Sequence, residues 1–345
     1  MRRHSPLLFL VLLLAACSGG GQPAEIGGTT MGTTYSVRYF GTPTTSDSDV
    51  TAAIDARLNE LETALSTYRS DSEVSRFNAF RGSDWFPVSA DTVTIVRAAQ
   101  TISAQSDGAF DITISPLVEL WGFGANQNRL QPPPEDAIQL LLASSGYEWL
   151  EQRIEPPALR KQLPALAIDL SAIAKGYAVD EIGELLNISG IESWLVEIGG
   201  EIKTKGIKRD GSPWRVAIEK PIAGSREVQQ VLPLDGAALA TSGDYRNYFE
   251  YAGKRYSHSI DPETGWPVAD RVGSVSVITS SAMLADAWAT ALLVTGDSRA
   301  LELANKHGLA LSLTLREPDG ELRRSTNAAF DAIAAAGAST NGSKP

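Results

Sequence analysis

The stretch from residue 167 to 182 changes from an apolar run to an amphipathic pattern, which limits how the chain can fold. Residues 166–168 are apolar and predict the end of a buried strand. Ser171 is a predicted helix N-cap. The residues that follow it recur at helical spacing and predict an inward-facing stripe of Ala174, Ala178, Ile182 and Leu185. The sequence therefore predicts a strand that turns into a helix starting near Ala172.

Polar and small residues crowd this predicted junction, namely Asp169, Ser171, Lys175 and Gly176. Helix N-termini attract anions because their first N–H groups have no partner within the helix. A glycine inside a helix costs roughly 1 kcal/mol relative to alanine, so Gly176 suggests that a ligand or another backbone segment approaches closely. An anion site and an ordinary capped helix with a surface lysine both fit these residues.

The rest of the chain alternates irregularly between helical and strand periodicity. Helices are predicted at residues 50–65, 89–106, 132–145, 281–295 and 298–307. Strands are predicted at residues 29–39, 194–198, 201–205, 214–218, 228–232, 238–241, 245–251, 255–260, 272–279 and 309–315. This irregular order favours an α+β fold over a regular doubly wound sheet.

The N-terminus has the pattern of a secretory signal. Two arginines, a short apolar run over residues 7–14 and Leu-Ala-Ala precede Cys17, the single cysteine of the chain. This resembles a bacterial lipobox, which predicts a signal peptide at residues 1–16, a lipidated Cys17 and a flexible tether at residues 17–28. An ordinary signal peptide with a stray cysteine is the alternative. A periplasm-facing lipoprotein is expected, and Ser18 favours the outer membrane without settling between outer and inner.

These limits leave residues 29–326 as one predicted domain, followed by a tail at residues 327–345 that is rich in Ala, Ser, Gly and Asn and is expected to be disordered. The formal net charge is -11, and it becomes -13 once the two arginines of the signal are removed. An acidic chain repels phosphate backbones, and the sequence has no basic run interleaved with aromatic residues, so nucleic acid is not an expected partner.

Two further features have candidate chemistry. Asp286 and Thr290 lie four residues apart on an otherwise apolar predicted helix, and their oxygens suit Mg²⁺; the alternative is that Asp286 is hydrogen-bonded in a polar seam. His258 precedes an Asp-Pro-Glu-Thr-Gly turn and is the one credible imidazole for acid–base work, unless it is a structural histidine. The sequence has no Ser-His-Asp order, cysteine nucleophile, Walker loop or dinucleotide glycine pattern.

Taken in order, several short motifs resemble the signatures of the ApbE family, the bacterial FAD:protein FMN transferases. They are Met-Gly-Thr-Thr-Tyr-Ser-Val at 31–37, Ser-Thr-Tyr at 66–68, Gly-Ala-Phe-Asp at 108–111, Asp-Leu-Ser-Ala-Ile-Ala-Lys-Gly-Tyr at 169–177, Gly-Gly-Glu-Ile at 199–202, Thr-Ser-Gly-Asp at 241–244, Ser-His-Ser-Ile-Asp-Pro at 257–262 and Ala-Asp-Ala-Trp-Ala-Thr at 285–290. Ser259 departs from the apolar residue expected at its position.

The resemblance implies a single α+β domain with a T-fold-like, β-rich core and flanking helices. It also implies a Mg²⁺-dependent transferase that takes FAD as substrate, passes FMN to a threonine hydroxyl of an acceptor flavoprotein and releases AMP. The implied flavin-binding residues are Met31, Tyr68, Ala109, Phe110, Asp111, Asp169, Lys175 and Ile260. The implied metal ligands are Asp286, Thr290 and Ala172 through its carbonyl, and His258 and Asp286 are the catalytic candidates.

Two other functions remain open for the same residues. In a Mg²⁺-dependent FAD pyrophosphatase, water replaces the threonine hydroxyl and the products are FMN and AMP. A non-catalytic FAD-binding lipoprotein would store or deliver the intact dinucleotide. Family resemblance suggests that the acceptor is a periplasm-facing subunit of an electron-transfer complex, but no residue of this chain selects one.

Overall fold

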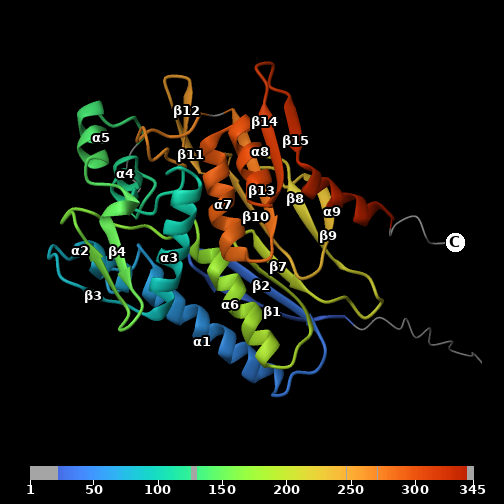
Figure 1. The fold of residues 1–345 in the computed structure, drawn as a ribbon. Helices are drawn as coiled ribbons and strands as arrows, with labels where there is room; N and C mark the ends of the chain where they lie inside the picture. Colours follow the sequence, from blue (N-terminus) through green and yellow to red (C-terminus); the bar gives the residue numbers. More distant parts are fainter. Residues whose placement is uncertain (1–21, 126–129, 246, 270, 340–345) are drawn as a thin grey trace, which may run out of the picture.

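The computed structural model describes residues 22–125, 130–245, 247–269 and 271–339. In this part of the chain, eight antiparallel strands form the largest sheet, in the order β1-β2-β6-β7-β10-β13-β14-β15 (Figure 1). The strands are β1 (Ala24–Thr30), β2 (Thr33–Phe40), β6 (Ser193–Ile198), β7 (Glu201–Lys205), β10 (Ala238–Gly243), β13 (Val272–Thr279), β14 (Ala310–Arg316) and β15 (Leu322–Thr326). An antiparallel sheet with separate helices confirms the predicted α+β class.

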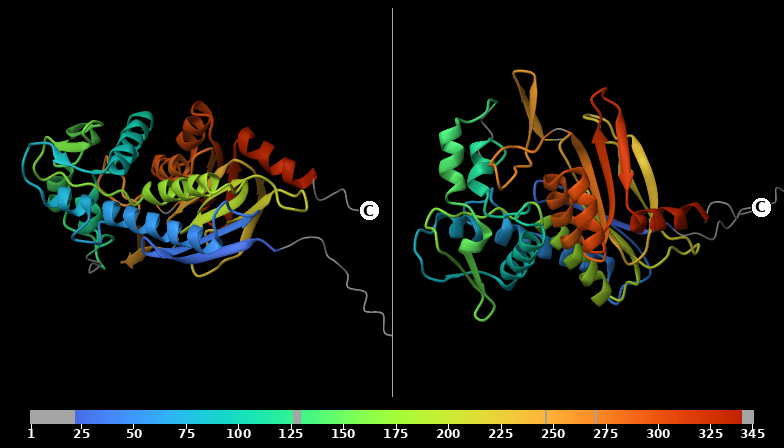
Figure 2. Two further views of the ribbon diagram at one scale, coloured as in Figure 1. Left: turned by 90° about the horizontal axis from the view of Figure 1, so that it is seen from below. Right: turned by 45° about the horizontal axis from the view of Figure 1, so that its top comes forward.

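Helices cover one face of this sheet. Helix α7 (Ala282–Thr295) packs on β10 and β13, α6 (Ala174–Ile188) packs on β6, β7 and α7, and α1 (Asp47–Leu65) packs on α6. In the left view of Figure 2, α1 and α6 lie on the same side of the strands. Helices α3 (Ala90–Gln105) and α8 (Asp297–Lys306) contact α7 from outside. Because α7 is enclosed in this way, most of its side chains are buried and apolar.

The opposite face carries a second core. Successive residues of a strand point to opposite faces. On β13, accordingly, Val275 and Val277 join the core under the helices, while Ile278 joins the second core. This second core is closed by the hairpin of β8 (Trp214–Glu219) and β9 (Val228–Leu234) and by helix α9 (Ala328–Ser339). Both faces of the sheet are therefore occupied.

Helix α9 corrects the prediction of a disordered tail for residues 328–339. The Asn327 side chain accepts from Phe330 N (3.1 Å) and Leu311 N (3.0 Å), so it starts the helix and ties it to β14. Phe330 is completely buried, and Ile333 packs beside it one turn later. Two large apolar residues at helical spacing, Phe330 and Ile333, hold this alanine-rich segment against the sheet.

The N-terminal predictions also change. The predicted strand at residues 29–39 is a hairpin, because Met31 (φ 48°) and Gly32 (φ 72°) adopt the left-handed conformation that a tight turn requires. Strand β1 starts at Ala24, so the predicted tether of residues 17–28 is too long. The predicted signal peptide and Cys17 lie outside the described residues. Within the described residues, no helix is both long and apolar enough to cross a membrane.

The remaining elements form a lobe beside the sheet. A small sheet has the order β3 (Phe86–Pro87), β5 (Ala158–Lys161), β4 (Leu150–Arg153). A third core centres on buried Trp121, which stacks with Tyr256 at 5.5 Å between ring centroids. The other elements here are α2 (Glu73–Ala79), α4 (Ser115–Leu120), α5 (Glu135–Leu142), a 3-10 turn (Tyr147–Trp149), β11 (Tyr248–Tyr251) and β12 (Lys254–Ser257). This lobe forms one wall of the cavity described next.

Candidate active site

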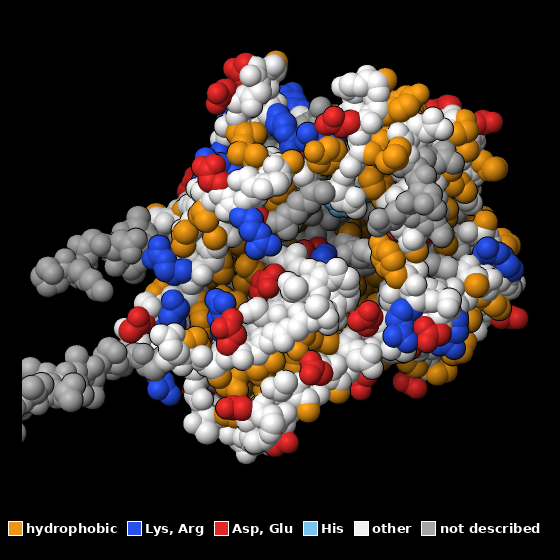
Figure 3. All heavy atoms as spheres, turned by 180° about the vertical axis from the view of Figure 1, so that it is seen from behind, with side chains coloured by type: hydrophobic (Ala, Val, Ile, Leu, Met, Phe, Trp, Pro, Cys, Tyr) orange, Lys and Arg blue, Asp and Glu red, His pale blue; other side chains and the backbone are white. Residues whose placement is uncertain are grey.

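A cavity of about 940 Å³ lies between the lobe and the large sheet. Seen from behind, the molecule is hollowed near its centre, and basic and acidic side chains lie together in the hollow (Figure 3). Every predicted flavin-binding, metal-binding and catalytic residue lines this cavity: Met31, Tyr68, Ala109, Phe110, Asp111, Asp169, Ala172, Lys175, His258, Ile260, Asp286 and Thr290. The structure thus brings together residues that are up to 259 positions apart in the sequence.

The strand-to-helix junction differs from its prediction in one respect. Helix α6 starts at Ala174, and its N-cap residue Ile173 makes no side-chain capping bond. Ser171 is not the N-cap, because its amide and hydroxyl both donate to Asp169 Oδ1, at 2.8 and 2.5 Å. The short Asp169–Ser171 turn therefore precedes the helix, and it presents the following backbone, including Ala172, to the cavity.

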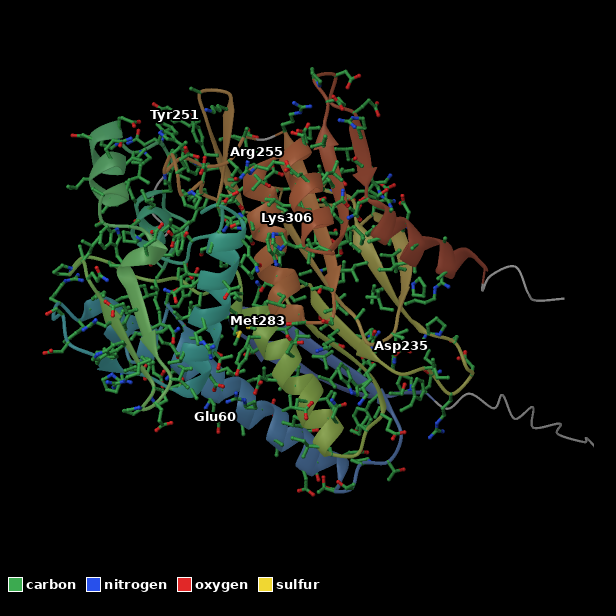
Figure 4. All side chains as sticks on the ribbon, in the orientation of Figure 1. Glu60, Asp235, Tyr251, Arg255, Met283 and Lys306 are labelled. Atoms are coloured by element: carbon green, nitrogen blue, oxygen red, sulfur yellow. The ribbon has the colours of Figure 1, made fainter. Side chains whose placement is uncertain are left out.

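Gly176 permits the close crossing of α6 and α7. A Cβ atom at this position would lie 2.2 Å from the carbonyl oxygen of Ala282 and 2.8 Å from Met283 Cα. In Figure 4, Met283 lies where the two helices meet. The glycine is therefore explained by a neighbouring backbone rather than by a ligand, and the amide that it exposes donates to Asp286 Oδ2 at 3.1 Å.

Asp180, which the sequence reasoning missed, fixes the start of α7. Its carboxylate accepts from Ser281 Oγ (2.7 Å) and from the amides of Ala282 and Met283 (both 3.0 Å). Lys203 Nζ approaches the same carboxylate at 2.6 Å. A carboxylate at a helix N-terminus is stabilised by the helix dipole and by the unpaired N–H groups. Asp180 thereby anchors α7 on α6, and it fixes the position of Asp286 one turn further along.

The charged centre of the cavity consists of Lys175, Glu201 and Asp286. Lys175 Nζ lies 3.3 Å from Glu201 Oε1 and 3.7 Å from Asp286 Oδ2. The two carboxylate side chains are 6% and 4% exposed. Glu201 Oε2 is buried and has no hydrogen-bond partner among the described residues. Glu201 was missed as a site residue, although it stands in the Gly-Gly-Glu-Ile motif that follows strand β6.

Burial and the neighbouring charges together shift the pKa values of all three side chains. Burial raises the pKa of Glu201 to about 8, a rise that Lys175 offsets only in part. It also raises the pKa of Asp286, against the opposing effect of Lys175. Burial alone would lower the pKa of Lys175, but the two carboxylates together raise it above its usual range. One cation thus faces two carboxylates in a poorly solvated space, an arrangement that favours an additional cation.

The predicted metal ligands fit a hard divalent cation. Asp286 is 3% exposed, and Thr290 lies one turn later with its hydroxyl 3.0 Å from Ser242 Oγ. The Gly176 amide, four residues after Ala172, donates to Asp286 and not to the Ala172 carbonyl. No other described backbone amide donates to that carbonyl, so its oxygen can face a cation. No cluster of three or more His, Cys, Asp or Glu side chains suited to a metal exists in the described ranges. Mixed carboxylate, hydroxyl and carbonyl oxygens suit Mg²⁺ better than a transition metal.

The predicted flavin residues differ in how much surface they offer. Tyr68 is 62% exposed, whereas Phe110 is only 3% exposed and packs in the main core. Tyr68 therefore offers a planar ligand much more aromatic surface than Phe110 does. Asp111 accepts from Thr113 N and Oγ1 (both 2.7 Å) and from Tyr147 N (3.0 Å), so its carboxylate shapes the cavity wall. Burial raises the pKa of Asp111 despite these bonds.

His258 lies on the lobe side of the cavity. Its Nδ1 is 3.2 Å from the carbonyl oxygen of Asn247, and its ring meets Phe123 edge-on at 6.4 Å between centroids. A carbonyl can only accept, so Nδ1 carries the proton in this contact and Nε2 keeps its lone pair. Burial lowers the pKa of His258, mainly because it disfavours the charged ring. The geometry thus suits a proton acceptor at neutral pH.

The chain is similar to known proteins over most of its length. The ApbE family model matches residues 31–313. The FAD:protein FMN transferase of Vibrio cholerae serotype O1 is 44% identical over 321 residues, covering 93% of this chain and 96% of that protein. The structure of the flavin transferase ApbE from Vibrio cholerae has a TM-score of 0.83 at 40% identity and covers 90% of this chain and 99% of that one. The apo structure of Pseudomonas stutzeri flavinyl transferase ApbE has a TM-score of 0.82 at 40% identity, covering 91% and 98%. The chain therefore belongs to the ApbE family.

Proposed function

We propose that this protein transfers FMN from FAD to a threonine hydroxyl of an acceptor flavoprotein and releases AMP, in a Mg²⁺-dependent reaction. The observation that carries the proposal is the convergence of the predicted flavin and metal residues on one cavity around Lys175, Glu201 and Asp286. A volume of about 940 Å³ suits a large ligand such as a dinucleotide. The FAD:protein FMN transferases among the relatives support the same activity.

The reaction exchanges the phosphoanhydride bond of FAD for a phosphate ester bond to the acceptor. The acceptor oxygen forms a bond to the phosphorus of the FMN half, the bridging P–O bond breaks, and AMP leaves with the bridging oxygen. The proton of the threonine hydroxyl is taken by Nε2 of His258, which is the free nitrogen of a ring that burial keeps neutral. Lys175 binds the negative charge of the pyrophosphate, and Tyr68 offers its exposed ring to a planar ligand.

Asp286, Thr290 and the carbonyl of Ala172 would hold the Mg²⁺ ion, which supplies positive charge against the negative charge that develops on the departing phosphate. Glu201 acts on this arrangement through Lys175, because it holds the ammonium group beside Asp286. The Asp180 contacts to α7 keep Asp286 and Thr290 on the cavity wall. Positioning of both helices is thus part of the proposed chemistry.

We further propose that residues 1–16 are removed, that Cys17 is lipidated and that the enzyme faces the periplasm. The support is the basic, apolar and small-residue pattern before Cys17, with Ser18 favouring the outer membrane. The expected acceptor is then a periplasm-facing electron-transfer subunit. Mass spectrometry of protein extracted from membranes tests the attachment: an acylated N-terminal Cys17 supports it, and a mature N-terminus beyond Cys17 contradicts it.

The activity is tested by incubating the protein with FAD and Mg²⁺, with and without a candidate acceptor, while AMP and protein-bound flavin are measured. Transfer predicts covalent flavin on an acceptor threonine and one AMP for each flavin attached. Full-rate AMP release without acceptor and without covalent flavin would identify a pyrophosphatase instead. Intact FAD at every Mg²⁺ concentration, also in an Asp286→Ala variant, would identify a binding protein without catalysis.

A further inference from the structure

A second hollow, of about 320 Å³, lies where the described chain begins, and it is rich in cationic side chains. Pro23 forms part of its wall, together with Arg38 from β2, Arg215 from β8 and the loop residues Lys208 and Arg209. These cations are up to 177 positions apart in the sequence, so no run of basic residues predicts the cleft. We call this hollow with its four cations the basic cleft.

The charge of the basic cleft is opposite to that of the whole protein. Among the described residues that line it, Asp210 is the one acid, and its carboxylate accepts from Ser212 N (2.9 Å) and Oγ (2.6 Å). Glu25, outside the lining, pairs with Arg38 at 2.8 Å. The lining thus combines four cations with one acid, on a chain whose formal net charge is -11. Such segregation creates a local field that attracts anionic surfaces.

The cations of the basic cleft are held on a firm support. Trp214 is 4% exposed and packs against Phe40 at 5.6 Å between ring centroids. Lys208 Nζ lies 5.7 Å from the Trp214 ring centroid, and the Lys208 amide donates to the Ser212 carbonyl at 2.9 Å. Lys208 and the exposed Arg209 therefore lie on a hydrogen-bonded turn that packs against the Trp214 ring. Ordering these side chains on binding costs less than ordering a free loop would.

The position of the basic cleft indicates which anionic surface it meets. Cys17 precedes Pro23 by six residues, and six extended residues span at most about 20 Å. A lipid attached at Cys17 therefore keeps the cleft within about 20 Å of the bilayer. We propose that the basic cleft is a docking surface for the anionic phospholipid headgroups of that bilayer, an inference that rests on the lipid attachment proposed above.

Docking at this surface would also place the active-site cavity near the membrane. Along β8, the outward-facing residues run from Arg215 in the basic cleft to Ala217 and Glu219 in the wall of the active-site cavity. Four residues of a strand span about 13 Å. A bilayer contact at the cleft therefore keeps the cavity close to the membrane surface, where a membrane-bound acceptor presents its threonine.

The test uses a chain that begins at Ser18, which lacks Cys17 but retains every described residue. Sedimentation with vesicles of phosphatidylcholine alone, and with added phosphatidylglycerol, measures binding without the lipid anchor. The proposal predicts binding to the anionic vesicles only, and binding that weakens steeply as salt is raised from 0.05 to roughly 0.3 M, because exposed charges are then screened. Equal binding to both vesicles, or no binding to either, would overturn the proposal.

A charge-reversal pair locates the surface. The double variant Lys208→Glu with Arg209→Glu is expected to bind anionic vesicles at least about 25-fold more weakly, since each basic residue near such a surface contributes roughly a factor of five. The matched control, Arg97→Glu with Lys306→Glu, makes the same charge change on α3 and α8, and Lys306 is labelled in Figure 4. The control should bind nearly like the unmodified chain. Equal weakening in both pairs would show a net-charge effect and refute the cleft.

Two further measurements keep the test decisive. Neither Lys208 nor Arg209 lines the active-site cavity, so FAD turnover in solution should be unchanged in the double variant. If that variant fails to fold, Arg209→Gln, which removes one charge from an exposed side chain, should still weaken vesicle binding about five-fold. The lipid attachment is scored separately by mass spectrometry of Cys17, so its failure and the failure of docking are distinguishable.

Discussion

Replacing Glu201 with glutamine should make the protein more stable at alkaline pH. Glu201 is buried, one of its oxygens lacks a partner among the described residues, and burial raises its pKa from 4.5 to about 8. In the unfolded chain this carboxyl ionises near pH 4.5. Between these two values the folded protein binds more protons than the unfolded one, so the free energy of unfolding falls as pH rises. The uncharged, isosteric glutamine removes this dependence.

The size of the effect follows from the shift. One pKa unit corresponds to about 1.4 kcal/mol, so the full rise at Glu201 corresponds to a loss on the order of 5 kcal/mol above pH 8. The side chain is only 6% exposed, so solvent screening reduces this figure little. The glutamine variant should match the unmodified protein near pH 5 and exceed its stability by several kcal/mol at pH 9.

Urea unfolding followed by tryptophan fluorescence, at pH 5, 7 and 9 in the presence of a chelator, measures the difference. Glu302→Gln is the control, because Glu302 is an exposed residue of α8 and the substitution changes the charge equally. The control should leave the pH dependence unaltered. Parallel pH curves for Glu201→Gln and the unmodified protein, or a less stable glutamine variant at pH 9, would refute the assignment of a buried carboxylate that Lys175 compensates only in part.

Three other substitutions test separate parts of the account. Gly176→Ala should destabilise the protein by about 2 kcal/mol or more in urea, because the new Cβ would lie 2.2 Å from the Ala282 carbonyl; a gain of stability, as expected for an ordinary helix position, would contradict the close crossing. Tyr68→Ala should raise KM for FAD with almost no change in unfolding free energy, since the side chain is 62% exposed; an unchanged KM would remove Tyr68 from the flavin site. His258→Gln should slow transfer and abolish an acidic inflection that lies below pH 6.5 in the kcat profile, because burial lowers the pKa of this imidazole; a retained inflection would assign the proton acceptor elsewhere.

The candidate site was predictable because its residues sit in short motifs whose order the fold preserves. Asp286 and Thr290 were identified as a pair on one helical face, and they do line the same cavity as Lys175. Periodicity alone does not predict that α7 packs on α6, because that contact depends on tertiary packing. Glu201 was missed for the same reason: a glutamate after a glycine turn looks like a surface residue until the sheet buries it.

The errors in the fold have local physical causes. Ser171 has the usual side chain of an N-cap, but the preceding Asp169 captures its hydroxyl and amide. The alanine-rich tail looked featureless because it holds few large apolar residues, one of which, Phe330, is completely buried. The Met31–Gly32 turn was hidden inside an alternating run, since only the positive φ angles of these two residues separate one long strand from a hairpin.

The most direct test of the account is mass spectrometry of an acceptor protein after incubation with this protein, FAD and Mg²⁺. We expect FMN attached to an acceptor threonine, an equal amount of AMP, and loss of both products in Asp286→Asn, a variant that should remain folded. Free FMN and AMP with an unmodified acceptor, or undiminished attachment by the Asp286→Asn variant, would contradict the proposed transfer.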